Sequence, residues 1–201
     1  MKTFVNYASL TQRERQKITG AAIIPRPIAW ISTRNLNGSI NVAPFSFFVM
    51  LSPSMLVVSF TKGDTKSKDS FVNIHRTKEA VVNIGDTHLV EAIDNTSQPL
   101  DYNESELSLV NLNMLDSQLV DVPFIQEALV SFEVVLHDEM LLDDDGKHSN
   151  VVVLKIVGSH INKDIYNEEK GYVTINSPIS RLAGAAFGAS TPLTYTRKFT
   201  K

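Results

Sequence analysis

Polar side chains interrupt a stretch of the chain, residues 24–60, that is otherwise typical of β-sheet. Ser32, Thr33, Asn41 and Ser46 fall at predicted strand ends or in the turn after a strand. Hydroxyl and amide groups at such positions can hydrogen-bond a ligand, but the same residue types also cap strands and build turns. Their spacing therefore leaves two interpretations open: a binding site for a polar molecule, or ordinary turn chemistry.

Residues that commonly carry catalysis show none of the expected spacings. The five histidines lack H-x-H or H-E-x-x-H spacing, and residues 143–146 lack the later glutamate of a calcium loop. No serine lies in a G-x-S-x-G elbow, and G-x-G-x-x-G and Walker-type loops are absent. We therefore predict no metal site, no catalytic nucleophile, and neither a Rossmann nor a P-loop mechanism.

The composition of the 201 residues is that of an ordinary globular chain, and we predict one domain over residues 1–201. The net charge of -3 comes from 19 basic and 22 acidic residues without a basic stripe, so nucleic acid is not an expected partner. The absence of cysteine excludes disulfides and thiolate chemistry. Without a signal-like apolar segment or an apolar run of about 20 residues, we expect a cytoplasmic protein that does not enter the membrane.

Several local signals predict the elements that position the polar residues. Thr11 and Glu14 have capping-box spacing, which predicts a helix over residues 11–20 that ends at Gly20. The dipeptide Asn37-Gly38 predicts a tight hairpin turn. Strands are predicted at residues 25–33, 38–44, 54–60 and 79–84, and a helix at residues 66–77 with Phe71, Ile74 and His75 on one face.

The second half of the chain predicts a mixed insertion followed by a long hairpin. Residues 86–121 carry capping residues and helical spacing in two short pieces. Alternating runs at residues 128–142 and 150–161, separated by the charged turn 143–149, predict neighbouring antiparallel strands. A further strand and an extended threonine-rich end are expected in the tail. The pattern predicts a mainly β (α+β) protein, an antiparallel barrel with short peripheral helices.

Several blocks, in this order, resemble the flavin reductase-like, FMN-binding split-barrel family. They are "PRPIAWIST", "NVAPFSFF", "SPSMLVVSF", "KDSFVNI", "EAVVNI" and "SPISRLAG". The correspondence covers nearly the whole chain and is least family-like over residues 86–121. The resemblance implies a split barrel that forms a homodimer and binds FMN noncovalently near the subunit interface.

The resemblance also implies which residues contact the cofactor. Ser32, Thr33 and residues 41–47 would line the isoalloxazine and ribityl portion, with Ser46 near the phosphate end. The "KDS" block would hold the phosphate together with the amino end of the helix that it begins. The implied cofactor-binding set is Ser32, Thr33, Asn41, Val42, Ala43, Pro44, Ser46, Phe47, Lys68, Asp69, Ser70 and Arg181.

Two family positions near the arginine depart from the pattern, with Ala183 where a second glycine is frequent and Phe187 near a frequent tyrosine. The physical logic otherwise agrees with the resemblance, because a phosphate of about -1.5 to -2 charge needs charge-assisted donors. The flavin performs the electron chemistry, so the protein needs no nucleophile.

Three functions remain open at this level. The first is an NAD(P)H-dependent flavin reductase, the second an FMN-bound electron carrier with a redox protein partner, and the third a flavin-binding or heme-like ligand-binding barrel without turnover. Trp30, the single tryptophan, is expected in the core or an interface, with flavin contact as the alternative. The insertion either covers a nicotinamide site or shields a sheet edge.

Overall fold

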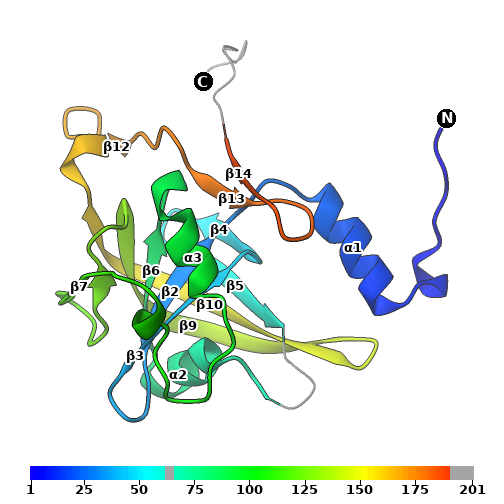
Figure 1. Cartoon of the computed structure of the whole chain (residues 1–201), viewed down its shortest axis with the longest axis horizontal. Coiled ribbons are helices and arrows are strands. Elements are labelled where there is room, and N and C mark those ends of the chain that lie inside the picture. Colours follow the sequence, from blue (N-terminus) through cyan, green and yellow to red (C-terminus); the bar gives the residue numbers. More distant parts are fainter. Residues whose placement is uncertain (62–65, 191–201) are drawn as a thin grey trace.

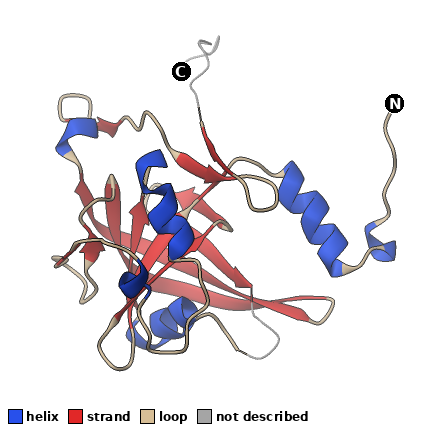
Figure 2. Cartoon of the chain, in the orientation of Figure 1, coloured by secondary structure: helices blue, strands red, loops and turns tan. Residues whose placement is uncertain are grey.

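The protein is built on one seven-stranded antiparallel sheet, which the computed structural model describes together with its surroundings over residues 1–61 and 66–190. Strands fill the centre of the molecule and short helices lie around them (Figure 2). The mainly β prediction is confirmed. In spatial order the strands are β3 (Ile40–Phe45), β2 (Ala29–Arg34), β6 (Glu79–Ile84), β9 (Val130–Asp144), β10 (Lys147–Ile161), β5 (Met55–Thr61) and β4 (Phe48–Ser52).

The sheet curls so that its two ends approach each other. Strands β3 and β4 are consecutive in the chain yet stand at opposite ends of the strand order. The ring of Phe45, the last residue of β3, packs edge-on against the ring of Phe60 in β5, with 4.6 Å between their centroids. This contact closes the inside of an antiparallel barrel whose end strands share no ladder hydrogen bonds.

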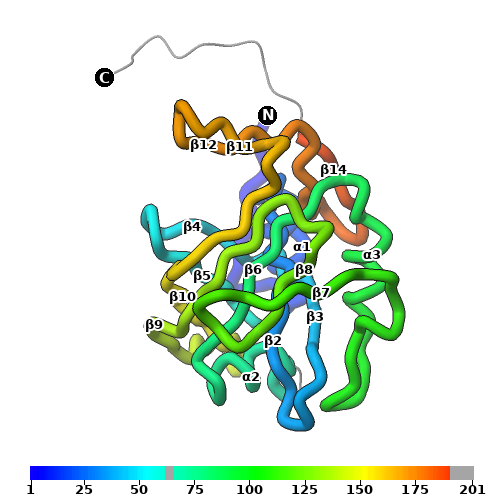
Figure 3. The backbone as a smooth tube through the Cα atoms, turned by 90° about the vertical axis from the view of Figure 1, so that its left-hand side faces the viewer, coloured from blue at the N-terminus to red at the C-terminus, as the bar shows by residue number. Residues whose placement is uncertain are grey.

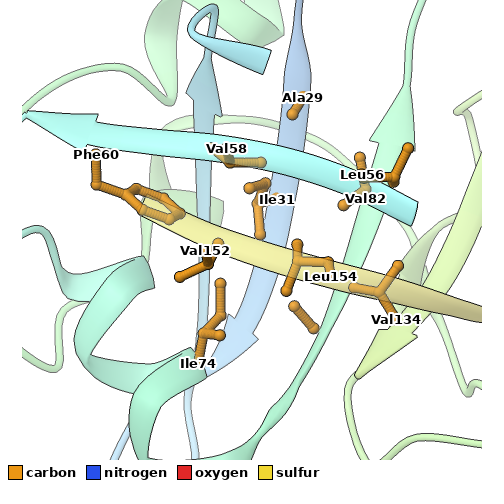
Figure 4. Packing of buried hydrophobic residues seen from close by; sticks show 11 residues of the cluster. Ala29, Ile31, Leu56, Val58, Phe60, Ile74, Val82, Val134, Val152 and Leu154 are labelled. Atoms are coloured by element: carbon orange, nitrogen blue, oxygen red, sulfur yellow. The ribbon is translucent and has the colours of Figure 1, made fainter. Parts of the chain in front are cut away.

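The barrel interior is an apolar cluster whose buried members come from the five inner strands and α2, while Phe45 of β3 and Phe48 of β4 pack against it from the edge strands. In β5 the side chains of Leu56, Val58 and Phe60 alternate inward with period two. Figure 4 shows these side chains meeting Ile31 and Ile74 between the strands. Full burial of such a side chain stabilises the fold by about 1.5 to 3 kcal/mol relative to exposure.

Both predicted hairpins are confirmed. The β2–β3 hairpin turns through Asn37 and Gly38, and Gly38 has the positive φ of 87° that a tight turn requires. The β9–β10 hairpin turns at Asp145 and Gly146, which also have positive φ. Strand β4 is a finding beyond the prediction, because "FVMLS" shows no alternation and carries three exposed apolar side chains.

The first helix, α1 (Gln12–Ala22), begins at the expected capping box of Thr11 and Glu14. Its predicted end at Gly20 is wrong, because the helix continues through two alanines, which are the strongest helix formers. None of its residues is buried, and it stands beside the barrel (Figure 1). Before it lies a short turn, η1 (Tyr7–Ser9).

The second helix, α2 (Asp69–Thr77), covers one end of the barrel. Ile74 is fully buried in the core and Phe71 packs against it, as predicted. His75 is exposed and its Nδ1 lies 2.7 Å from Oε1 of Glu139 in β9, so only part of the predicted face points inward.

The segment 86–121 contains the two short helical pieces that its capping residues predict. They are α3 (Val90–Asn95) with the preceding turn η2 (Thr87–Leu89), and η3 (Glu106–Leu109). Figure 3 shows α3 on the side of the molecule away from β4. The segment ends in a two-stranded ribbon of β7 (Met114–Leu115) and β8 (Phe124–Ile125).

The tail adds short strands at one end of the barrel, and the predicted threonine-rich end lies outside the described residues. None of the helices within residues 1–61 and 66–190 is long and apolar enough to cross a membrane. The remaining elements are β1 (Arg26–Pro27), η4 (Lys163–Ile165), β11 (Tyr166–Asn167), β12 (Tyr172–Val173), β13 (Ile179–Arg181) and β14 (Phe187–Ala189).

Candidate functional site

A pocket of about 200 Å³ opens at the amino end of α2, between this helix, β3 and the chain that comes after α3. In Figure 1 the segment after α3 passes in front of β3 and reaches down to α2. The pocket combines hydroxyl, amide, ammonium and carboxyl groups. Its lining residues are Asn41, Ala43, Pro44, Phe45, Lys66, Ser67, Lys68, Asp69, Ser70, Thr96, Ser97, Gln98, Pro99, Leu100 and Glu106.

Half of the site residues predicted from the sequence meet in this pocket. They come from two segments that are separated by more than twenty positions in the chain, and the curled sheet and α2 bring them together. The members are Asn41, Ala43, Pro44, Lys68, Asp69 and Ser70.

Thr33 lies behind this pocket and does not line it. Its side chain is fully buried, and its Oγ1 accepts hydrogen bonds from Nδ2 of Asn41 at 3.2 Å and Nδ2 of Asn73 at 3.1 Å. The same Nδ2 of Asn41 also donates to Oγ of Ser70 at 2.9 Å. Thr33 therefore fixes side chains at the back of the pocket wall, because a buried hydroxyl must find partners.

Ser32 belongs to a second internal network, on the other face of β2. Its Oγ donates to the carbonyl of Pro123 at 2.8 Å and accepts from Nδ2 of Asn83 at 3.3 Å. The Oδ1 of Asn83 in turn accepts from the backbone of Ile125 and from Ser131. The buried polar residues of β2 thus join strands and loops to one another, a role that the sequence did not predict.

The amino end of α2 lines the pocket through Lys68, Asp69 and Ser70. Lys68 is the N-cap residue, and its side chain makes no capping hydrogen bond to this end of the helix. The first turn of a helix leaves backbone N–H groups without partners and carries a partial positive charge. The ammonium of Lys66 lies 3.5 Å from a carboxylate oxygen of Asp69, and Ser67 and Ser70 add hydroxyl groups. This end of the pocket can bind an anion.

Glu106 is the one acidic pocket residue that sequence reasoning missed, because nothing in "SELSL" distinguishes it from an exposed glutamate. It is 6% exposed, and its Oε2 accepts a hydrogen bond from the backbone N–H of Val42 at 2.9 Å. Removal from water raises the pKa of its carboxyl, and the bond from Val42 only partly offsets that effect. Val42 itself was predicted to contact the cofactor, but its side chain packs in the apolar cluster around Trp30.

A second pocket, of about 490 Å³, lies between α1, the turn after β3 and the tip of the β9–β10 hairpin. Phe47 and Tyr7 contribute aromatic rings to it, and Arg15 and Arg26 contribute guanidinium groups. Arg15 is 2.5 Å from a carboxylate oxygen of Asp145 on the hairpin tip. The linings of the two pockets include residues only two positions apart in the sequence, Phe45 in the first pocket and Phe47 in the second.

The other predicted site residues stand apart from the first pocket. Ser46 is half-buried in the turn between β3 and β4, next to Phe47. Arg181 lies on β13, with its guanidinium carbon 4.6 Å from the centre of the Phe187 ring and its Nη1 donating to the carbonyl of Ala185. Neither Ser46 nor Arg181 lines either of the two pockets.

Trp30 is a core residue. It is fully buried, and its indole N–H donates to Oγ1 of Thr96 at 2.9 Å. This bond fixes the end of α3 and so one wall of the first pocket. Within the part of the chain that the structure describes, no three histidine, aspartate or glutamate side chains are grouped as around a metal ion.

Comparison with known proteins gives a consistent result. The model of a family described as "Flavin reductase like domain" matches residues 21–198. An uncharacterized protein from Bacillus subtilis, YwrF, is 34% identical over 181 residues, which cover 87% of this chain and 88% of that protein.

The solved structures with a similar fold agree. Nitrilotriacetate monooxygenase component B from Bacillus cereus superposes with a TM-score of 0.92 at 29% identity, over 98% of this chain and 99% of that one. Pseudomonas fluorescens 2-nitrobenzoate 2-nitroreductase NbaA has a TM-score of 0.84 at 25% identity, over 99% of each chain. A putative flavin reductase with a split barrel domain from Shewanella frigidimarina, at 18% identity over 96% of each chain, has a TM-score of 0.80. The expected split-barrel fold is confirmed.

Proposed function

This chain belongs to the flavin reductase-like family, and we propose from that premise that it binds FMN noncovalently and reduces it with NADH or NADPH. The family and its split-barrel fold indicate flavin chemistry in general. The choice of FMN and of a nicotinamide donor is the proposal.

The observation that carries the proposal is the donor set of the first pocket. Uncapped backbone N–H groups of α2, the ammonium groups of Lys66 and Lys68 and the hydroxyls of Ser67 and Ser70 meet in one place. These are the groups that a phosphate monoester needs, since helix amino ends and charge-assisted donors favour anions. The pocket therefore fits the phosphate of FMN.

The remaining lining suits the rest of such a ligand. Ala43, Pro44 and Phe45 form an apolar wall of the same pocket. Asn41, fixed by Thr33 and Ser70, presents its amide beside this wall. When bound, FMN would supply a hydride acceptor, so this chain's residues need only bind, orient and exclude water.

The second pocket favours a reductase over a protein that only carries electrons. Its volume of about 490 Å³ lies within the range of small-molecule sites. A reductase needs room for a second organic ligand, which an electron carrier does not need. The resemblance at 29% identity to a protein named as component B of a monooxygenase supports a role alongside a second protein.

We also propose that the protein is a homodimer. On edge strand β4, the residues Val49, Met50 and Leu51 are 52 to 66% exposed to solvent. Helix α1 has no buried residue. A helix of eleven residues is marginal in water on its own, because helices in proteins gain most of their stability from packing. A second subunit would cover such surfaces.

The test is reduction of the FMN-loaded protein by NADH and by NADPH without oxygen in a stopped-flow instrument. Bleaching of the flavin absorbance in a saturable reaction is the expected result. A folded protein that binds FMN but is not bleached by either donor would be the electron carrier or the binding protein. A folded protein that binds no FMN in calorimetric titration would refute the proposal as a whole.

A further inference from the structure

Two glutamates are buried among the acidic residues that the structure describes, Glu106 and Glu133, and their surroundings differ. Glu133 accepts hydrogen bonds from two backbone N–H groups and from His160, which together lower the pKa of its carboxyl against the effect of burial. Among the described residues, Val42 is the one other residue that donates to Glu106, and the pKa of Glu106 is raised because burial outweighs this bond. Only Glu106 lines the pocket.

The charged groups that face Glu106 all come from one side of the pocket. They are Lys66, Lys68 and Asp69 at the start of α2, and the Asp69 carboxylate makes a charge on Glu106 less favourable. Strand β3 and the chain at residues 96–100 contribute no ionisable side chain to the lining. On its own segment, the nearby Glu104 is exposed and accepts a hydrogen bond from the backbone of Asp101.

The phosphate site of the proposed function therefore already contains two carboxyl groups. A phosphate monoester would add about 1.5 to 2 negative charges to the same pocket. Like charges in a partly water-excluded site disfavour one another's ionisation. Asp69 has Lys66 as a counter-ion at 3.5 Å, whereas Glu106 forms no ion pair with any of the described residues. Glu106 is the group that can relieve the repulsion.

Resting on the proposed flavin function, we propose that Glu106 makes phosphate binding in this pocket proton-coupled: its carboxylate takes one proton from solvent when a phosphate monoester enters. An O–H bond forms on Glu106, and no bond in the ligand breaks. The neutral carboxyl keeps one oxygen to accept the bond from Val42. Glu106 is thereby a residue that sets the pH dependence of ligand choice between a phosphorylated flavin and its unphosphorylated form.

The structure offers a variant that imitates the protonated state. Glu106→Gln keeps the side-chain length and an oxygen for the Val42 N–H. The segment is also held independently, because Oγ of Ser105 donates to the carbonyl of Ile40 in β3. Glu104→Gln is the matched control, since it removes an exposed carboxylate two residues away.

The experiment is calorimetric titration with FMN and with riboflavin between pH 5.5 and 8.5, in two buffers of different ionisation enthalpy so that protons are counted. For the parent protein and Glu104→Gln, FMN binding takes up protons, at most one per site, at a pH between the pKa of Glu106 in the free protein and its higher pKa in the FMN complex, and riboflavin binding takes up none. Glu106→Gln takes up none with either ligand. Between these two pKa values the FMN affinity of Glu106→Gln gains up to about tenfold over the parent for each pH unit, as one proton per ligand requires.

The second ionisation of the FMN phosphate also contributes to the proton count. This contribution cancels when the parent protein and Glu106→Gln are compared at the same pH. Proton uptake that persists in Glu106→Gln assigns the proton to another group and refutes the inference. Weaker binding of both FMN and riboflavin by Glu106→Gln would indicate that Glu106 binds a hydroxyl group that both ligands carry. This result also refutes the inference. Equal FMN binding without proton uptake refutes the inference but leaves the proposed function intact. Absence of FMN binding to the folded parent refutes the proposed function itself. If Glu106→Gln does not fold, the parent protein is titrated with FMN at pH 7.5 to 8.5, where a phosphate monoester with a second pKa of about 6 is already a dianion, and absence of proton uptake there refutes the inference.

Discussion

Glu133 of β9 fastens the end of the segment 86–121 to the barrel, and its replacement by glutamine is expected to destabilise the protein strongly. The residue is 1% exposed. Its Oε1 accepts from the backbone N–H of Gln118 at 2.9 Å and lies 2.5 Å from Nε2 of His160. Its Oε2 accepts from the N–H of Leu119 at 2.6 Å. Three donors thus converge on one carboxylate.

The size of the effect can be worked out from these contacts. Glu133→Gln keeps one acceptor oxygen, turns an amide N–H₂ group toward one of the three donors and makes the other bonds neutral. A hydrogen bond to a charged group contributes about 1.5 to 3 kcal/mol, roughly twice a neutral one. Losing one such bond and weakening two gives about 3 to 5 kcal/mol, in the range for breaking a buried pair. For a chain of this size Tm would fall by about 6 to 20 °C.

The assay is urea unfolding monitored by the fluorescence of Trp30, which is the single tryptophan and is fully buried. Protein concentration is held constant, because a dimer would make stability depend on it. Glu139→Gln is the matched control: Glu139 also contacts a histidine, but both side chains are partly exposed, so its loss is expected to cost at most about 1 kcal/mol.

The pH dependence gives a second check on the same reasoning. Burial raises the pKa of Glu133, but the bonds from Gln118, Leu119 and His160 outweigh it and leave the pKa below its ordinary value. An acid with a lowered folded-state pKa contributes stability above its unfolded pKa, about 4.3, and loses it as the pH falls through the folded value. The difference in the free energy of unfolding between the parent protein and Glu133→Gln should therefore become smaller below about pH 4. A loss under about 1 kcal/mol at neutral pH, or a gap that does not narrow in acid, would refute the account.

Two further predictions concern the proposed function. Lys68→Ala removes a charge-assisted bond worth about 1.5 to 3 kcal/mol, so FMN affinity should fall about ten- to a hundredfold while riboflavin affinity stays nearly constant. Both affinities are measured by titration at low salt, with Lys17→Ala on α1 as the control. If Lys68→Ala binds FMN as tightly as the parent protein, the phosphate site lies elsewhere. Light scattering at micromolar concentration should give the mass of a dimer for the parent protein and of a monomer for Met50→Glu on edge strand β4, whereas a monomeric parent would contradict the proposed dimer.

Local features of the fold could be predicted from the sequence because neighbouring residues determine them. Asn37-Gly38 meets the steric demand of a tight turn by itself, and Thr11 with Glu14 forms a capping box within one helical turn. The order of the family-like blocks predicted the split barrel. The end of α1 was predicted too early, at Gly20, although the two alanines that follow favour helix. Strand β4 was not predictable, because its pairing with β5 defines it.

The chemical roles of polar residues were decided by the tertiary structure. Ser32, Thr33 and Asn41 look alike as polar interruptions of two strands, yet only Asn41 lines the pocket, because α2 and the segment around Pro123 provide buried partners for the other two. Glu106 and Glu133 are likewise single glutamates that each precede an apolar residue, yet their pKa values shift in opposite directions. Sequence determines which groups are present, but burial and the donors that reach each group come from residues distant in the chain. Those two quantities set the free energy of every charge and hydrogen bond.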